Sequence, residues 1–211
     1  MDPLPQGVGW MEVVTGCMFS GKTSELIRRV QRAMYARQSV VVFKPRIDDR
    51  YTDDSVGSHS GQTLRSIQID HAGQIPGLVS DAQVVAVDEA HFLGLELVAI
   101  VENLANEGRR VIVAGLDMDY RGVPFEPIPQ LLAVSEYITK NLAICMVCGN
   151  PADRSQRMVD RSGRFLVGAA EAYEARCRKH WSAEVASDLQ RALPLGRNLA
   201  EELPVDLPDG R

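Results

Sequence analysis

The sequence predicts an α/β fold in which a parallel β-sheet is covered by helices on both faces. Short apolar runs rich in β-branched residues alternate along the chain with segments whose apolar residues recur at helical spacing, and this alternation is typical of buried parallel sheets. A glycine-rich loop with the pattern G-x-x-x-x-G-K-[ST] lies between the first apolar run and the first helical segment. An acidic pair, Asp88-Glu89, ends a later run.

Length and composition limit the possible classes of protein. The chain has 211 residues, which fits one sizeable domain with at most a small appendage. It is 45% hydrophobic and 24% charged, and its net charge of -5 argues against binding to bulk nucleic acid or to an anionic membrane. Because we find neither a long apolar run nor a signal-peptide profile, we expect a cytoplasmic protein whose cysteines stay reduced.

The first elements follow directly from the apolar pattern. Residues 1–9 contain two prolines and two glycines and are expected to form a flexible lead-in. Trp10–Thr15 reads as the first strand, Gly16–Thr23 as the glycine-rich loop and Ser24–Arg37 as the helix that follows. Ser39–Lys44 is a continuous apolar run that predicts a second buried strand.

The central part continues the alternation after a polar interruption. Arg46–Gly61 has little apolar content and is expected to be a surface loop. Val84–Val87 predicts a strand, and Leu93–Asn106 a helix that stops near Gly108. Val111–Ala114 predicts the next strand of the same parallel sheet.

The apolar pattern changes near residue 145, which sets the expected domain boundaries. We place an α/β domain at 10–143 and a small second domain at 144–182, in which Arg154–Arg164 is polar and expected to be loop-like. Residues 183–211 begin with one helical pattern and continue with several prolines and glycines, so a helix followed by a disordered tail is expected there.

The glycine-rich loop predicts a site for a nucleoside triphosphate. Glycines at both ends let the backbone wrap tightly, and the N–H groups of the loop and of the following helix attract an anion. Lys22 adds a positive charge, and Thr23 offers a hydroxyl to Mg²⁺. The residues of this phosphate loop are Gly16, Cys17, Met18, Phe19, Ser20, Gly21, Lys22 and Thr23. A chance match is the alternative, and the flanking strand and helix argue against it.

Asp88 and Glu89 are the expected acidic partners of the phosphate loop. A carboxylate at the C-terminal end of a buried strand holds Mg²⁺ in such sites, which is the role assigned to Asp88. Glu89 should project into the crevice at the strand ends, where it can orient water or take a hydroxyl proton; a simple ion pair is its alternative. Asp88–His91 also matches the acidic box of helicases, but those motors need two such domains and a basic track for single strands, and this chain is too short and too acidic.

Three of the four cysteines join a histidine in a pattern that predicts a structural zinc site. Cys145-x-x-Cys148 and Cys177-x-x-His180 can each present two ligands to one ion, and four protein ligands leave no open position for catalysis. The 28 residues between the pairs are expected to form a loop whose base the zinc fixes. Random or redox use of the cysteines is the alternative. For Cys17, at a helix N-terminus, a lowered thiol pKa and sensitivity to oxidation are a hypothesis.

Seven motifs occur in order from Gly9 to about Trp181. They are Gly16–Thr23, Asp48–Tyr51, Asp88–Phe92, Gly115–Asp117, Cys145–Cys148, Val167–Tyr173 and Cys177–His180. Together they resemble the zinc-containing (type II) thymidine kinases. The resemblance implies transfer of the ATP γ-phosphate to the 5′-hydroxyl of thymidine, and of deoxyuridine, in nucleotide salvage. It also implies a RecA-like P-loop domain, a zinc domain with a lasso loop over the nucleoside, and a homotetramer.

The resemblance further implies roles for individual residues. Glu89 corresponds to the proton acceptor, and Lys22 and Thr23 to contacts with phosphate and Mg²⁺. Asp88, Glu89, Ala90 and His91 are expected to bind ATP and Mg²⁺ together with the phosphate loop. The positions that correspond to the nucleoside site are Met18, Phe92, Leu116, Tyr120, Phe125, Ser155, Arg164, Phe165, Leu166, Val167, Gly168 and Tyr173. Independently of the resemblance, Arg50 could neutralise charge on the transferred phosphoryl group.

Some positions depart from the family pattern, and some interpretations stay open. Cys17 replaces the usual proline, His91 the usual glutamine and Ala169 a common glycine, and Ser58–Gly61 matches a phosphate-contacting segment only in part. Without the resemblance, the aromatic residues Tyr120 and Phe125 could simply belong to the core. Two other functions use the same motifs: an ATPase stimulated by polynucleotide, and a regulatory module that binds a nucleotide and a partner without chemistry.

Overall fold

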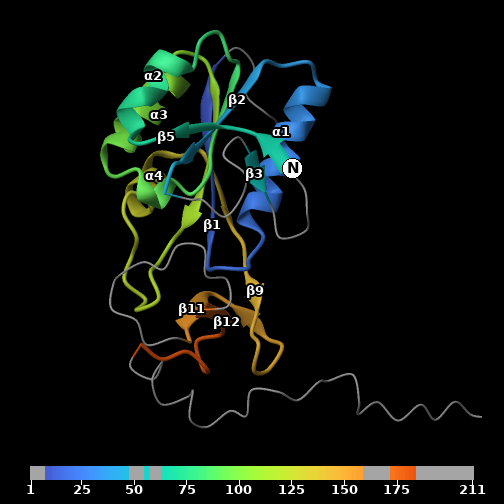
Figure 1. The fold of residues 1–211 in the computed structure, drawn as a ribbon, viewed down its shortest axis with the longest axis vertical. Coiled ribbons are helices and arrows are strands. Elements are labelled where there is room, and N and C mark those ends of the chain that lie inside the picture. The colour runs from blue at the N-terminus through green and yellow to red at the C-terminus, as the bar shows by residue number, and fades with distance from the viewer. Residues whose placement is uncertain (1–7, 48–54, 58–62, 159–171, 184–211) are drawn as a thin grey trace, which may run out of the picture.

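The computed structural model describes residues 8–47, 55–57, 63–158 and 172–183 (Figure 1). Its main part is a six-stranded sheet in the order β5-β2-β6-β7-β1-β8, in which every pairing is parallel. These strands are β1 (Trp10–Gly16), β2 (Val40–Pro45), β5 (Ile67–Ile69), β6 (Val84–Val87), β7 (Arg110–Leu116) and β8 (Tyr137–Lys140). The predicted α/β architecture is therefore confirmed.

The strand order brings the two principal motifs to one edge of the sheet. The phosphate loop follows β1 and Asp88 follows β6, and only β7 lies between these two strands. The last residues of β1 and β7, Gly16 and Leu116, pair with each other, and β6 ends three residues earlier, where Val87 pairs with Val113. The phosphate loop and the acidic pair consequently face one another across the end of β7.

Helices cover both faces of the sheet because neighbouring strand residues point in opposite directions. On one face, Val14 and Ile112 pack against Leu26, Ile27 and the other buried residues of α1 (Lys22–Tyr35). The other face packs against α2 (Ile75–Leu78), α3 (Glu96–Asn106) and α4 (Ile128–Val134) (Figure 1). Short 3-10 turns, η1 (Ala72–Gln74) and η2 (Ala90–Phe92), precede α2 and α3. No helix of the described segments has the length and apolarity needed to cross a membrane.

Several sequence predictions about single elements were wrong or incomplete. The helix expected from Leu93 begins at Glu96, because η2 and the positive φ of 73° at Gly94 interrupt the chain first. The expected loop Arg46–Gly61 contains β3 (Ser55–Gly57), which pairs with β4 (Thr63–Arg65). Strands β5 and β8 and helices α2 and α4 were missed, since short elements carry too little periodicity.

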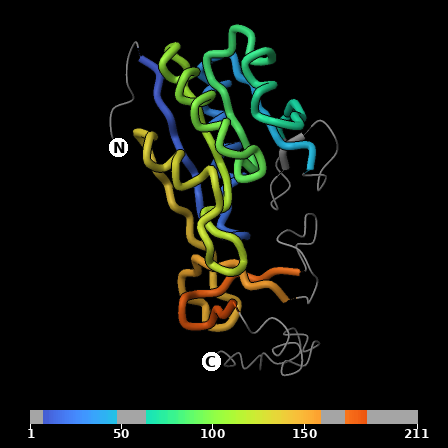
Figure 2. Tube along the Cα trace, turned by 90° about the vertical axis from the view of Figure 1, so that its left-hand side faces the viewer, coloured from blue at the N-terminus to red at the C-terminus, as the bar shows by residue number. Residues whose placement is uncertain are grey.

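A small β-rich part lies beyond the carboxyl ends of the sheet strands (Figures 1 and 2). We call residues 143–157 and 172–182 the C-terminal module. It contains two antiparallel pairs, β9 (Ala143–Ile144) with β10 (Pro151–Ala152) and β11 (Arg154–Arg157) with β12 (Tyr173–Arg176). The first part of the expected loop Arg154–Arg164 is thus a strand. The predicted segments 1–7, 159–171 and 184–211 lie outside the described residues.

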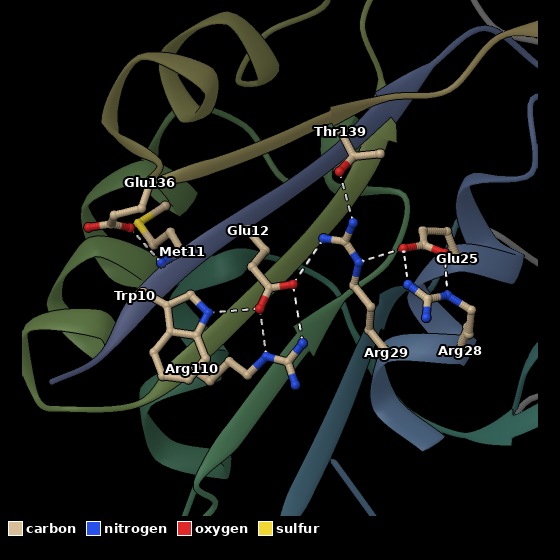
Figure 3. A network of polar contacts seen from close by, with 9 residues as sticks. All are labelled: Trp10, Met11, Glu12, Glu25, Arg28, Arg29, Arg110, Glu136 and Thr139. Carbon is tan, nitrogen blue, oxygen red and sulfur yellow. Dashed lines mark hydrogen bonds and ion pairs between the residues drawn. The ribbon is translucent and has the colours of Figure 1, made fainter. Parts of the chain in front are cut away.

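A buried carboxylate fixes β1 to α1, the two elements on either side of the phosphate loop (Figure 3). The side chain of Glu12 on β1 accepts hydrogen bonds from Trp10 Nε1 at 2.8 Å, Arg110 Nε at 2.6 Å and Arg29 Nη1 at 2.9 Å. Arg29, on α1, also donates to Thr139 Oγ1 of β8 at 2.8 Å. One network of hydrogen bonds and ion pairs therefore joins β7, β1, β8 and α1.

Candidate active site

The phosphate loop has the tight backbone that its glycines predict. Gly16 has a φ of 141°, Phe19 of 64° and Gly21 of 80°. A Cβ atom at Gly16 would lie 2.2 Å from the carbonyl oxygen of Asn141, so only glycine fits there. Gly21 caps the N-terminus of α1, and the partly exposed Thr23 stands in its first turn. The loop therefore leads directly into the helix N-terminus, as an anion site requires.

Two groups in the phosphate loop suit an anionic ligand. Lys22 is buried, and its Nζ donates to the Cys17 carbonyl oxygen at 2.8 Å. Burial lowers the pKa of Lys22, while the nearby carboxylates, Glu89 first among them, act in the opposite direction. The hydroxyl of Ser20 is buried and has no hydrogen-bond partner among the described residues. A phosphate oxygen would satisfy both groups, so the loop fits a nucleoside triphosphate.

The acidic pair lies where the sequence predicts it, with an unusual backbone. Asp88 is buried just after β6, and its Oδ1 accepts a hydrogen bond from the Glu89 N–H at 3.0 Å. Glu89 is 8% exposed and has φ 48° and ψ 39°, the left-handed region. This conformation costs an ordinary residue about 1–2 kcal/mol, and such strain concentrates at functional sites. Both carboxylates act electrostatically on Lys22 across the end of β7.

His91 lies at the centre of the residues assigned to the nucleoside. Its Nδ1 accepts a hydrogen bond from the Leu116 N–H at 3.2 Å and lies 3.6 Å from Oε2 of Glu89. The contact with Glu89 is not an ion pair, because a nitrogen that accepts from Leu116 carries no proton. The ring centroid of His91 is 4.1 Å from that of Phe92 and 4.7 Å from that of Phe125. The structure therefore gathers Glu89, Leu116 and both phenylalanines around one histidine.

The phosphate loop is also in contact with the C-terminal module. The Met18 N–H donates to Ser155 Oγ at 3.0 Å, and Cys17 Sγ donates to the Ala152 carbonyl oxygen at 3.4 Å. Cys17 packs in a small buried cluster of the module together with Cys145. Residues that are 137 positions apart in the sequence thus meet directly, and the position of the loop depends on the module.

Tyr120 and Tyr173 both contact an arginine, Arg157, that the sequence did not indicate. The guanidinium carbon of Arg157 is 4.7 Å from the ring centroid of Tyr120 and 5.9 Å from that of Tyr173. Trp181 Nε1 donates to the Tyr120 carbonyl oxygen at 3.1 Å. Arg157 is 2% exposed. An arginine in a polar stretch gives no signal of burial, which explains why the sequence did not reveal it.

An ion pair between Lys140 and Asp117 at the carboxyl ends of the strands was also not predicted from the sequence. Lys140, at the end of β8, lies with its Nζ 2.8 Å from Oδ2 of Asp117. Asp117 follows β7 and is buried. Its charge acts on Lys22 of the phosphate loop as well. The motif Gly115–Asp117 was noted in the sequence, but nothing there indicates its partner Lys140.

The predicted zinc ligands Cys145, Cys148, Cys177 and His180 bring their four ligand atoms together in one cluster. Cys145 Sγ and Cys177 Sγ lie 3.7 Å and 3.4 Å from His180 Nδ1, and Cys148 Sγ lies 3.8 Å from Cys177 Sγ. Ligands about 2.3 Å from one ion at the tetrahedral angle are about 3.8 Å apart, so the cluster could hold zinc. Burial disfavours the Cys145 thiolate, but backbone N–H groups outweigh it and lower its pKa to about 5.

Comparison with known proteins decides the family. The family model described as "Thymidine kinase" matches residues 9–181. The chain belongs to the thymidine kinase family. A thymidine kinase of Rhodothermus sp. is 57% identical over 82% of this chain and 81% of its own length. A thymidine kinase of Bdellovibrio bacteriovorus is 53% identical over 84% of this chain and 87% of its own.

Similarity to solved structures is weaker. The ATPase DotB of Legionella pneumophila has a TM-score of 0.42 at 13% identity and covers 70% of this chain and 44% of DotB. A DNA replication initiation factor has a TM-score of 0.38 at 13% identity, over 63% of this chain and 40% of that protein.

The nucleoside positions differ in how far they are exposed. Met18, Phe92, Leu116 and Tyr120 are partly exposed, whereas Phe125, Ser155 and Tyr173 are buried. The partly exposed apolar side chains are the ones that a ligand could cover. The positions assigned to the nucleoside or the phosphate that lie outside the described residues are Arg50, Arg164, Phe165, Leu166, Val167 and Gly168.

The hypothesis of a reactive Cys17 thiol was wrong. Cys17 is 2% exposed, and burial raises its pKa although the nearby Lys22 acts in the opposite direction. Its Sγ turns away from the helix N-terminus and toward Ala152 of the C-terminal module. The lowering of a thiol pKa that a helix N-terminus usually causes is therefore outweighed by burial at Cys17.

Cys17 is expected to resist iodoacetamide in the folded protein, because its thiol is both buried and protonated at neutral pH. Peptide mass spectrometry after timed labelling would measure the modified fraction. Labelling of the same cysteine in 8 M urea serves as the control, where about complete modification is expected once burial is lost. Rapid labelling of the native protein that ATP prevents would contradict the prediction.

Proposed function

We propose that this protein is a thymidine kinase, which transfers the γ-phosphate of ATP to the 5′-hydroxyl of thymidine. The chain belongs to the thymidine kinase family, and its relatives with that name are more than half identical to it over most of its length. The observation that carries the proposal is the buried Lys22 of the phosphate loop opposite the buried pair Asp88-Glu89. That arrangement suits phosphoryl transfer.

The residues of the phosphate loop and the acidic pair take complementary roles in this proposal. The loop amides and Lys22 hold the phosphates, while Thr23 and Asp88 are the residues that would hold Mg²⁺. Mg²⁺ supplies neutralisation of phosphate charge when it is bound. Glu89 accepts the proton of the 5′-hydroxyl as that oxygen attacks in line. Arg50 remains a prediction for stabilising the transferred group.

The nucleoside is proposed to bind between the phosphate loop and the C-terminal module. The thymine methyl group needs an apolar slot, and Met18, Phe92, Leu116, Tyr120 and Phe125 supply apolar surface. Ser155 and Tyr173 stand on the opposite, module side. Backbone contacts from residues 164–168, deoxyuridine as a second acceptor, the homotetramer, the cytoplasmic location and the boundary between 143 and 144 all remain predictions.

Zinc is proposed as a structural ion that holds the C-terminal module together. Cys145, Cys148, Cys177 and His180 would provide all four ligands, so zinc would take no part in the chemistry. The ion would connect the strand β9 with the turn after β12. Because the module contacts the phosphate loop, we propose that zinc supports the ATP site as well as the nucleoside site.

Removing zinc is expected to raise KM for ATP by about tenfold, the equivalent of losing one good hydrogen bond. The reason is that the Met18 amide depends on Ser155 of the module. KM for both substrates would be measured before chelation, after chelation and after zinc is restored. If only KM for thymidine changes, the loop does not depend on the module.

The proposed function is tested by ATP turnover with Mg²⁺, in which ADP and thymidine monophosphate are quantified together. Equal amounts of both products, formed only when thymidine is present, are expected. ADP formation that requires polynucleotide would instead support the ATPase alternative. Absence of turnover together with zinc-dependent capture of a partner would support the regulatory module.

A further inference from the structure

His91 is a buried histidine that contacts the predicted catalytic carboxylate, and the proposed function gives it no role in the reaction. Its side chain is 1% exposed, and its ring lies between the rings of Phe92 and Phe125. The residue stands in η2, directly after the turn that carries Glu89. It therefore connects the acidic pair to the aromatic side of the site.

The hydrogen bond from Leu116 fixes the tautomer of this histidine. Because the Leu116 N–H donates to Nδ1, that nitrogen is unprotonated and the ring proton is assigned to Nε2. The same Nδ1 lies 3.6 Å from Glu89 Oε2. In the other tautomer, Nδ1–H would donate to Glu89 and the Leu116 N–H would lose this acceptor. The observed bond thus prevents His91 from donating to Glu89 through Nδ1.

The end of β7 and the turn after Glu89 also pack closely. A Cβ atom at Gly115 would lie 3.4 Å from the His91 backbone nitrogen and 2.6 Å from Cδ1 of Ile128, so the two backbones are near each other. The next residue of β7, Leu116, makes the bond with His91, and Asp117 follows with its ion pair to Lys140. The His91–Leu116 bond consequently joins the strained Glu89 turn to a strand end that is itself fixed.

We propose that His91 is a positioning residue, which fixes the Glu89 turn to the end of β7 through the hydrogen bond that its Nδ1 accepts from the Leu116 N–H. The inference rests on the proposed role of Glu89 as proton acceptor. The bond holds the left-handed backbone of Glu89 in place, so its carboxylate keeps the position that proton transfer from the 5′-hydroxyl requires.

Two variants of similar size separate the hydrogen bond from the packing of the ring. His91→Asn keeps an acceptor oxygen close to the position of Nδ1, whereas His91→Leu has none, and both remove the imidazole. We expect kcat of the leucine variant to be about tenfold below that of the asparagine variant, with KM for both substrates differing by less than about threefold. Equal kcat values in the two variants would overturn the proposal, and thermal unfolding of both shows whether each is folded.

A measurement without turnover tests the geometry independently. Nitrogen-15 NMR of the histidine rings should show an unprotonated Nδ1 and a protonated Nε2 at His91 at neutral pH. The Leu116 amide should exchange its hydrogen slowly in the wild type and in His91→Asn, and faster in His91→Leu. A protonated Nδ1 overturns the inference. If the NMR results are as expected but thymidine is not phosphorylated, the proposed function fails, and with it the link to Glu89.

Discussion

Replacing Glu89 with glutamine is expected to lower kcat by about 10²-fold or more, which is a typical contribution of a general base. Glutamine has the same size and can still accept a hydrogen bond, but its amide cannot take the proton of the 5′-hydroxyl. The left-handed backbone conformation at position 89 costs glutamate and glutamine the same free energy. The substitution therefore removes the basic group while it leaves the turn in place, and steady-state kinetics with ATP and thymidine would measure the loss.

ATP binding provides the internal control for this variant. The affinity for ATP, measured by calorimetric titration without thymidine, should change little, because the phosphates are assigned to Lys22 and the loop amides. Glu96→Gln is a matched control: the side chain of Glu96 is 54% exposed, and its carboxylate contacts the Gly73 N–H at 3.3 Å and His71 Nδ1 at 3.9 Å, outside the site. Near-normal kcat in Glu89→Gln would remove Glu89 from the role of proton acceptor.

The sequence was most informative where the determining interactions are local. The strand β1, the phosphate loop and α1 follow one another directly, so apolar runs, glycines and a lysine at fixed spacing were enough to predict them. Asp88 and Glu89 could be assigned because they follow a buried run at the end of a strand. The cluster of Cys145, Cys148, Cys177 and His180 was predicted in the same way, since each pair occupies one turn of the backbone.

The interactions between distant segments could not be predicted in this way. Met18 meets Ser155, and Arg157 contacts both Tyr120 and Tyr173, only after the C-terminal module folds against the sheet. The error about Cys17 has the same origin. Its place at a helix N-terminus suggested an acidic thiol, but burial depends on tertiary packing and decides the direction of the pKa shift.

Replacing Glu12 with glutamine is expected to lower the free energy of unfolding by about 3–5 kcal/mol, the usual effect of removing one partner from a buried ion pair. The side chains of Arg29 and Arg110 are only 11% and 12% exposed, so the variant leaves two buried cations without their shared carboxylate (Figure 3). Urea denaturation at pH 7 would measure the change. Arg28→Gln is the matched control, because Arg28 is 54% exposed in its pair with Glu25 and should contribute only about 0.2–0.5 kcal/mol.

The dependence of the unfolding free energy on pH tests whether the charge of Glu12 is responsible for this stabilisation. Burial opposes ionisation of Glu12, but the hydrogen bonds and charges of Arg110, together with Trp10 and Arg29, outweigh it and hold its pKa below the usual value. A carboxyl group with a lowered pKa in the folded state stabilises the protein fully above its unfolded pKa of about 4.3, and this stability is lost as the pH falls through the folded pKa. The difference in unfolding free energy between the wild type and Glu12→Gln should therefore be constant above about pH 5 and shrink below it. A difference that stays constant into acid would mean that Glu12 contributes through packing and not through its charge.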